Sequence, residues 1–597
     1  MTLHHNDFWT ERALALVYWD SPWRQLVSHP MPTPDTRWFE GATLNAATNC
    51  LDRHLAAGLG DKPAIIWQGE PDAESETYSY RQLHHEVCRM AGALAALGVG
   101  PGDVVAINLP ALPEVAVAML ACARLGAVHF VSFAGLSGAT LVERLCACRA
   151  KTLITADGFY RAGRLVPLKP LADEAMALCP AITRCVVVRR AGTNVPMTPG
   201  RDLWWHELAA ARDGAAPVPA SAMAATDPLF ILYTTGASGH PKGVIHSTGG
   251  FLVQAAASTQ AALGLTGDDI LWCTADPGWI NGQAHALYGP LCLGATTLMY
   301  GGSPTHPQPD RIWRVVEKYG VTVLFTDPAL VGQLMREGEA WPRGRNLESL
   351  RLVASVGSVL SNEARQWLTR HVARSKARVV NCWGQTESGG VLLVSAPGTD
   401  MSPLPGVDVA EAGTRLVLTS AWPGMAIGLV EGAEAFAQSY LQTEPGAFDT
   451  GDQVRRAADG SVILEGRALE LGSGGSNLAA IETAIAAHPD VAEVAALSGD
   501  PVRVFVTLRA EAEAMETGVM GGGEGMETVL AGLARAVAAC PLIIRIVPDL
   551  PKTRSGKIAR QALRHAAVGN ETFGDTSLID DPSVLSGLFE GKDKLFG

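Results

Sequence analysis

The chain lacks several patterns that would place it in a familiar class of protein. Its eleven cysteines include no CxxC pair, so a structural zinc site is not expected. It has no GxSxG or HExxH motif, which leaves a serine hydrolase or a zinc protease without support. No uninterrupted apolar run reaches membrane-spanning length, and no charged-then-apolar signal pattern opens the chain. These absences favour a cytoplasmic protein without membrane insertion.

Positive charge is also scarce. The net charge is −13 and the isoelectric point is about 5.6, which argues against a general binder of nucleic acid or anionic membranes. A nucleotide site remains compatible, because it needs only local positive charge. The 47% of hydrophobic residues predicts compact folding. A length of 597 residues predicts two or three domains.

The apolar pattern predicts two folding units. From about residue 60 to 395, short apolar runs alternate with longer helical stretches, which is typical of α/β layers with parallel sheets. Shorter β-like runs follow, and a glycine-rich linker begins at 466. We therefore expect a large multi-sheet α/β domain, 1–466, and a small mobile α+β domain, 467–597. The expected elements of the small domain are helices 478–487 and 526–539 and strands 492–497, 502–508 and 543–547.

The most informative segment is YTTGASGHPKGV, residues 233–244. It follows an apolar run and combines small hydroxyl residues and glycines with Lys242. Glycines let backbone N–H groups approach a phosphate, hydroxyls add donors and lysine supplies charge. Lys242 is followed by Gly243, so the segment is not a Walker A loop. A flexible turn between a strand and a helix is the alternative.

A second basic turn, LPKTRSGKI, lies at 550–558. Alone it could be a solvated loop. Together the two segments resemble the phosphate loop and the C-terminal lysine motif of the adenylate-forming (ANL) superfamily. Segments 44–54, 117–128, 273–279 and others resemble its acetyl-CoA synthetase-like branch, and the resemblance covers nearly the whole chain.

This resemblance implies sites for ATP and Mg²⁺. Lys557 would contact the carboxylate and the α-phosphate, since an ammonium group suits a developing anion. Glu387 would bind Mg²⁺. Asp452 would accept the ribose hydroxyls, with Arg467 in support. The ATP phosphates would be bound by Thr234, Thr235, Gly236, Ser238, Gly239 and Lys242. The rest of the nucleotide site would comprise Gly357, Ser358, Asn381, Cys382, Trp383, Gln385 and Thr386. Ser358 stands where relatives carry a carboxylate, which predicts weaker nucleotide affinity.

The acyl pocket implied by the resemblance is lined by Ile280, Asn281, Val356 and Gly384. Relatives carry a tryptophan at the position of Gly384, and its indole closes the pocket around acetate. We expect its removal to open a channel for a longer acid, unless neighbouring side chains refill the space. Asn281, in place of a threonine, could face a polar group on the acyl chain.

The CoA site is the least complete. Arg161 and Arg164 resemble residues that hold the CoA nucleotide, and arginine binds phosphate in a bidentate way. Leu469 replaces the hinge aspartate of relatives, and the following turn, 472–477, has no arginine. The identity of the acid and the oligomeric state are not encoded in any recognisable pattern.

The expected function is ATP-dependent activation of a carboxylic acid larger than acetate to acyl-AMP, followed by thioesterification to CoA. One alternative is transfer of the acyl group to an amine or a carrier-protein thiol. The other is a degenerate nucleotide- or acyl-binding protein without activity. No nucleic-acid partner is expected.

Overall fold

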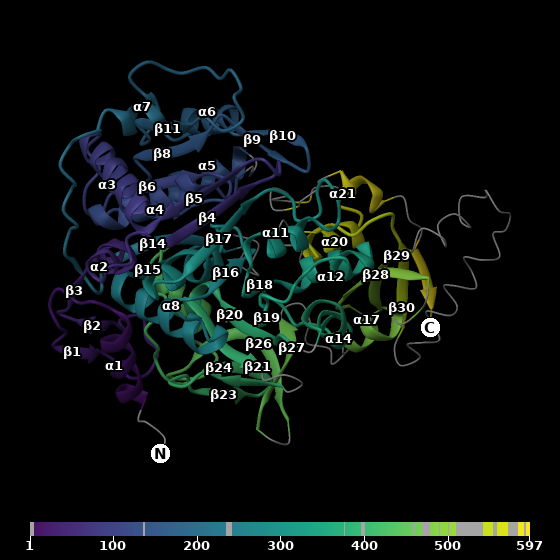
Figure 1. Cartoon of the computed structure of the whole chain (residues 1–597). Helices are drawn as coiled ribbons and strands as arrows, with labels where there is room; N and C mark the ends of the chain where they lie inside the picture. Colours follow the sequence, from purple (N-terminus) through teal and green to yellow (C-terminus); the bar gives the residue numbers. More distant parts are fainter. Residues whose placement is uncertain are drawn as a thin grey trace. The chain divides into compact units, whose positions relative to one another are not determined.

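The structure is a computed structural model. It describes residues 5–134, 136, 138–234, 241–374, 376–395, 400–457, 460–467, 478–486, 488, 490–499, 501–508, 541–552, 558–570, 573, 579, 583–589 and 593–596. The chain divides into two compact units (Figure 1). The first comprises residues 1–450 and 456–463, and the second comprises 451–455 and 464–597. The division falls within the hairpin β26 (Phe448–Arg456) and β27 (Val462–Arg467), and the functional boundary expected at 466 stays a prediction.

One sheet of the first unit has eight strands in the order β12-β11-β8-β6-β7-β14-β15-β25. The first six run parallel, and β15 and β25 complete the edge in antiparallel pairs. The strands are β12 (Asp202–Trp204), β11 (Arg184–Val188), β8 (Thr152–Ala156), β6 (Val104–Asn108), β7 (Val128–Val131), β14 (Pro228–Thr234), β15 (Lys242–Ser247) and β25 (Gly428–Leu429). Apolar runs predicted as buried strands became the centre of this sheet, because parallel strands are covered on both faces.

A second sheet has thirteen strands in the order β23-β24-β26-β27-β22-β21-β20-β19-β18-β16-β17-β4-β5. Its strands from β20 to β4 run parallel. Besides β26 and β27, they are β23 (Val409–Ala412), β24 (Arg415–Leu418), β22 (Met401–Pro403), β21 (Gly390–Ser395), β20 (Arg378–Gln385), β19 (Leu352–Ser355), β18 (Val323–Thr326), β16 (Ile270–Cys273), β17 (Thr296–Gly301), β4 (Pro63–Gly69) and β5 (Ser75–Ser79).

The helices of this unit begin and end at local signals. Ser79 and Gln82 form a capping box at the start of α3 (Tyr80–Ala96). Helix α4 (Pro113–Leu125) starts with proline and ends at Gly126 in the left-handed region. Asp327 accepts from two backbone N–H groups of α12 (Pro328–Glu337). A core of Trp272, Trp313, Val353 and Leu368 joins α11 (Arg311–Tyr319) and its neighbours to the second sheet.

The second unit contains a four-stranded sheet in the order β28-β29-β30-β31. One core cluster includes Ile485 and Val504, and another includes Phe505 and Leu563. Its elements are α17 (Leu478–Ala486), β28 (Val491–Leu497), β29 (Val502–Leu508), β30 (Leu542–Ile546), α20 (Arg560–Ala567), α21 (Val584–Gly587) and β31 (Asp593–Phe596). The helix expected at 478–487 and the three expected strands agree with these elements, whereas the helix expected at 526–539 lies outside the described residues. The predicted α/β class with a small α+β unit is confirmed.

Two further observations concern membrane-spanning helices and disulfide bonds. Among the described residues, no helix is both long enough and apolar enough to cross a bilayer. Cys146 and Cys179 form a disulfide between α5 (Gly138–Ala147) and the residue after α6 (Lys169–Leu178). A disulfide is not expected of a cytoplasmic protein, because that compartment keeps thiols reduced. The sequence could not reveal it, because packing of the two helices brings cysteines 33 residues apart together.

Candidate functional site

The glycine-rich segment connects two antiparallel strands. Thr234 at the end of β14 lies opposite Lys242 at the start of β15. The segment therefore joins one strand to its antiparallel neighbour, and the alternative in which it leads into a helix is wrong for this place. Thr235, Gly236, Ser238 and Gly239 lie outside the described residues. Thr234 and Lys242 mark the two ends of the turn.

Lys242 is held by helix α15 (Ala433–Tyr440), which carries none of the sequence motifs. Its Nζ donates to Ser439 Oγ at 2.8 Å and lies 5.2 Å from the centre of the Tyr440 ring. An ammonium group over an aromatic face is attracted by the ring quadrupole. These contacts orient the lysine beside the turn it was expected to serve.

Glu387 lies in the short helix η4 (Thr386–Ser388) and is buried. One of its oxygens accepts from the Tyr440 hydroxyl at 2.6 Å. Tyr440 therefore contacts both Lys242 and Glu387, which are 145 positions apart in the sequence. The spacing of Phe436 and Tyr440 predicts only a packed helix face, so the role of the hydroxyl emerges from tertiary contacts.

This arrangement fits a magnesium nucleotide. Mg²⁺ is usually bound by one or two carboxylates together with substrate phosphates and water. Among the described residues, no group of three or more His, Cys, Asp or Glu side chains is placed to hold a metal ion. Glu387 is thus suited to a metal that arrives with a phosphate, and Lys242 to the phosphate itself.

One expected nucleotide-binding residue, Asn381, lies within β20 at the point where the parallel pairing with β19 ends. Ser355 on β19 is in register with Asn381 on β20. Both are buried, and the Asn381 amide oxygen and the Ser355 hydroxyl have no hydrogen-bond partner within the described part of the chain. Leaving a buried acceptor unpaired costs free energy. An exocyclic amino group of a nucleobase would satisfy Asn381, so this residue fits its expected role.

The remaining residues of the expected nucleotide site differ in backbone conformation and in exposure. Gly357 has a φ of 105°, a conformation that favours glycine, and Ser358 after it is exposed. Cys382 faces the protein core, where burial raises its pKa to about 12, so its thiol is not presented to a ligand. Trp383 is also buried.

Hydrogen bonds from two residues of the Gln385–Glu387 motif connect it to other parts of the fold. Gln385 Nε2 donates to the carbonyl oxygen of Thr450 at 2.6 Å. The carbonyl oxygen of Thr386 lies 2.7 Å from Nε2 of the buried His246. Burial lowers the pKa of His246 to about 4, so its ring is neutral near pH 7 and donates here. These bonds hold the segment that carries Glu387.

The expected ribose pair is joined by an ion pair. Asp452 on β26 is buried, and its Oδ1 lies 3.2 Å from Nε of Arg467 on β27. The arginine is thus placed to orient the carboxylate, which offers two acceptors to a vicinal diol.

Two of the four expected acyl-pocket residues share a cavity. Asn281 and Val356 line it together with Thr274, Trp279 and Asp327. Its volume is about 10 Å³, room for about one water molecule. Ile280, which precedes Asn281 in the sequence, is buried but does not line this cavity.

Gly384 does not border a channel as expected. A Cβ at this position would lie 2.9 Å from the carbonyl carbon of Gly390 and 3.1 Å from Val391 Cα, and closer still to the Gly390 oxygen. The irregular register between Trp383 and Gly384 brings the backbone of β21 against this residue. Relatives place a tryptophan side chain here. In this chain the backbone of β21 occupies the space beside Gly384, whereas the sequence suggested that side chains could refill it.

We therefore expect Gly384→Ala to destabilise the protein by about 1–3 kcal/mol, because it overpacks β20 against β21. Urea denaturation would measure the change. Gly428→Ala is the matched control, since a Cβ at Gly428 in β25 meets no atom within 4 Å. Equal stability of the two variants would contradict this account of Gly384.

Arg161 and Arg164 lie opposite each other on a hairpin of β9 (Gly158–Arg161) and β10 (Arg164–Pro167). Both are exposed. Arginine binds phosphate in a bidentate way, so two guanidinium groups on paired positions of one hairpin suit a phosphate. The two arginines thus fit a polyanionic ligand.

Lys557 lies outside the described residues, as do Leu469 and the turn 472–477. The residues that flank the lysine turn are described. Lys552 and Ile558 form an antiparallel bridge, and the Ala559 N–H donates to the Pro551 carbonyl oxygen at 2.7 Å. The two ends of the turn are therefore held together.

Comparisons with known proteins show which family the chain resembles. Family models match three parts of the chain: "AMP-binding enzyme" at residues 52–421, "Acetyl-coenzyme A synthetase N-terminus" at 3–50 and "AMP-binding enzyme C-terminal domain" at 480–557. The chain is 40% identical to acetyl-coenzyme A synthetase 2 of Pseudomonas putida over 98% of its own length and 94% of that protein. It is 39% identical to acetyl-coenzyme A synthetase of Rubrobacter xylanophilus with the same coverage.

A solved structure has a similar fold. Acetoacetyl-CoA synthetase from Streptomyces lividans matches with a TM-score of 0.86 and 24% identity, covering 98% of this chain and 92% of that one.

Proposed function

The chain belongs to the AMP-binding enzyme family, in its acetyl-coenzyme A synthetase-like branch, and on that premise we propose that it is an AMP-forming acid–thiol ligase. It would use ATP, Mg²⁺ and CoA. A carboxylate attacks the α-phosphate of ATP, giving acyl-AMP and pyrophosphate, and the CoA thiol then displaces AMP to form the thioester.

The observation that carries the proposal is that Tyr440 contacts both Lys242 and Glu387. Charge that spreads over a phosphoryl group needs a cation, backbone donors and a metal rather than a nucleophilic side chain. Mg²⁺, when bound, would supply Lewis-acid stabilisation of the phosphate oxygens. Lys242 adds a fixed positive charge at the end of the glycine-rich turn, and Tyr440 keeps the carboxylate of Glu387 oriented.

Each of the two units offers polar groups that suit one part of a nucleoside. Asn381 offers a buried acceptor to the base. Asp452, oriented by Arg467, offers two acceptors to the ribose. Such preorganised groups lose little freedom on binding, which favours affinity.

The finer proposal is that the acid is larger than acetate. It is supported by the polar groups of Asn281 and Thr274 at the cavity beside Val356. A cavity of about 10 Å³ must widen to admit a longer chain. Each further methylene buried there would contribute about 0.8 kcal/mol.

A graded series of acids tests both levels of the proposal. Pyrophosphate release is measured with acetate, with longer straight-chain acids and with their hydroxy or keto forms, each with and without CoA. We expect at least one acid to release pyrophosphate and to form acyl-CoA. Adding one favourable methylene should raise kcat/KM by about fourfold, the equivalent of about 0.8 kcal/mol.

The outcomes separate the alternatives. Acetate as the best substrate would remove the proposal of a larger acid and leave the ligase intact. Acyl-AMP formation without any acyl-CoA would indicate a different acceptor, such as an amine or a carrier-protein thiol. If no acid of the series causes pyrophosphate release, the enzyme proposal is removed.

A further inference from the structure

Glu70 connects the end of β4 to the hairpin that carries Arg161 and Arg164. It is buried, with 4% of its surface exposed. One carboxylate oxygen accepts from the Ala162 N–H and the other from the Gly163 N–H, each at 2.8 Å. We propose that Glu70 is a positioning residue for CoA, because it fixes the turn between the two arginines. This inference rests on the proposed function.

The turn needs such support. Ala162 and Gly163 have φ values of 49° and 72°, and a two-residue hairpin of type I′ requires positive φ at both central positions. Glycine adopts this conformation readily, whereas an alanine there is strained by its Cβ. Hydrogen bonds from both turn N–H groups to one carboxylate offset that strain and fix the direction in which the hairpin projects.

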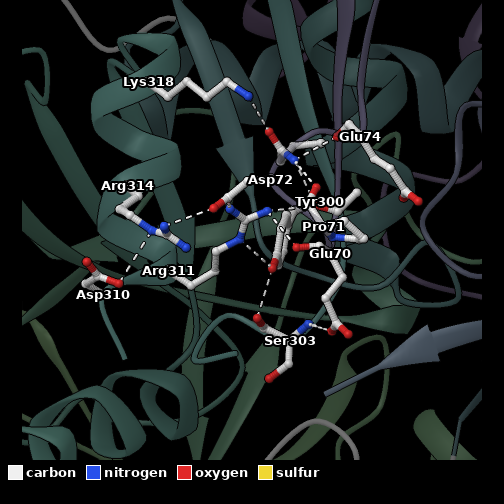
Figure 2. A network of polar contacts seen from close by, with 12 residues as sticks. Glu70, Pro71, Asp72, Glu74, Tyr300, Ser303, Asp310, Arg311, Arg314 and Lys318 are labelled. Atoms are coloured by element: carbon white, nitrogen blue, oxygen red, sulfur yellow. Dashed lines mark hydrogen bonds and ion pairs between the residues drawn. The ribbon is translucent and has the colours of Figure 1, made fainter. Parts of the chain in front are cut away.

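The carboxylate is itself firmly held. Ser303 donates its N–H to the same oxygen that Ala162 contacts, at 2.9 Å. Figure 2 shows Arg311 reaching the backbone around Glu70. Its Nη2 donates to the carbonyl oxygens of Gly69 and Glu70, at 2.8 and 2.9 Å. Arg311 is 2% exposed and also forms an ion pair with Asp72.

This anchor determines where two guanidinium groups sit. Arg161 and Arg164 are directly opposite in the strand register, so their Cβ atoms lie about 5 Å apart on one face of the hairpin. A tilt of the turn would move both groups together. The pair is suited to the phosphate-bearing end of CoA, where misplacing both arginines would weaken binding without affecting adenylation.

The test compares Glu70→Gln with the unaltered full-length protein. Glutamine has the same shape but only one acceptor oxygen, so at least one of the three N–H groups loses its partner. We expect the KM for CoA to rise about tenfold. Acid-dependent ATP–pyrophosphate exchange, measured without CoA, should stay unchanged.

Two further variants distinguish positioning from a general structural role. Glu74→Gln is the matched control, because Glu74 lies on the same loop and pairs with Arg190 at 2.5 Å instead of with the hairpin. It should leave the KM for CoA unchanged. Adding Ala162→Gly to Glu70→Gln should restore part of the CoA affinity, since glycine adopts the left-handed turn without strain.

The result that overturns the proposal is an active protein whose Glu70→Gln form keeps its KM for CoA, or loses exchange and CoA affinity equally. If that variant does not fold, Glu70→Asp is measured in the same way, and an unchanged KM for CoA overturns the proposal. An unaltered protein that adenylates no acid, or makes no acyl-CoA, would instead defeat the proposed function and this inference with it.

Discussion

Lys557→Ala is expected to lower acid-dependent pyrophosphate release by about 100- to 1000-fold, the cost typical of removing one donor to a developing anion. The ammonium group is proposed to neutralise charge as the carboxylate attacks the α-phosphate. Alanine removes that charge and leaves no substitute at the position. Initial rates with a saturating acid would measure the loss.

A second lysine in the same segment provides the control. Lys552 precedes the turn and pairs with Glu493 at 2.6 Å. Lys552→Ala removes a positive charge of the same kind, five residues away, and should keep the rate within a few-fold of the unaltered protein. Undiminished pyrophosphate release by Lys557→Ala would show that this lysine has another role. Equal losses in both variants would indicate a requirement for general positive charge.

The second large effect concerns stability. Lys169 at the start of α6 is fully buried, and its ammonium group lies 2.8 Å from Asp173 and 2.9 Å from the fully buried Asp202. It also donates to the carbonyl oxygen of Pro196. Lys169→Met should lower the free energy of unfolding by about 3–5 kcal/mol, because a carboxylate is left in the core with one partner fewer. Urea denaturation would measure it.

Lys151→Met is the matched control, since Lys151 forms an ion pair with Asp103 while its side chain is 66% exposed. Lys151→Met should lower the free energy of unfolding by less than about 1 kcal/mol. An equal loss of free energy of unfolding in Lys169→Met and Lys151→Met would contradict the claim that burial makes the ion pairs of Lys169 more important.

The loss in Lys169→Met should depend on pH. Burial disfavours the charged form of Asp202, but hydrogen bonds from Arg201, the Thr198 N–H and Lys169 outweigh it and lower the pKa to about 2. Since the ordinary pKa is 3.8, the stability contributed by the ionised carboxylate is present above pH 4 and is lost as pH falls towards 2. The difference in the free energy of unfolding between Lys169→Met and the unaltered protein should therefore become smaller as the pH falls from 4 to 2.

The sequence by itself determined the family and the order of the elements. Apolar runs such as 152–155 and 185–188 became β8 and β11, because alternation of buried strands with helices is a local property of the chain. The glycine-rich turn and Lys242 were also identifiable, since phosphate binding depends on residue types that are contiguous.

Only the tertiary structure decided what surrounds these residues. Tyr440 joins Lys242 to Glu387, Glu70 joins the end of β4 to the hairpin of Arg161, and the backbone of β21 takes the space beside Gly384. Each contact links segments from different strands or helices, or depends on a bulge in the strand register. A pattern along the chain carries no record of such pairings, because packing in three dimensions selects them.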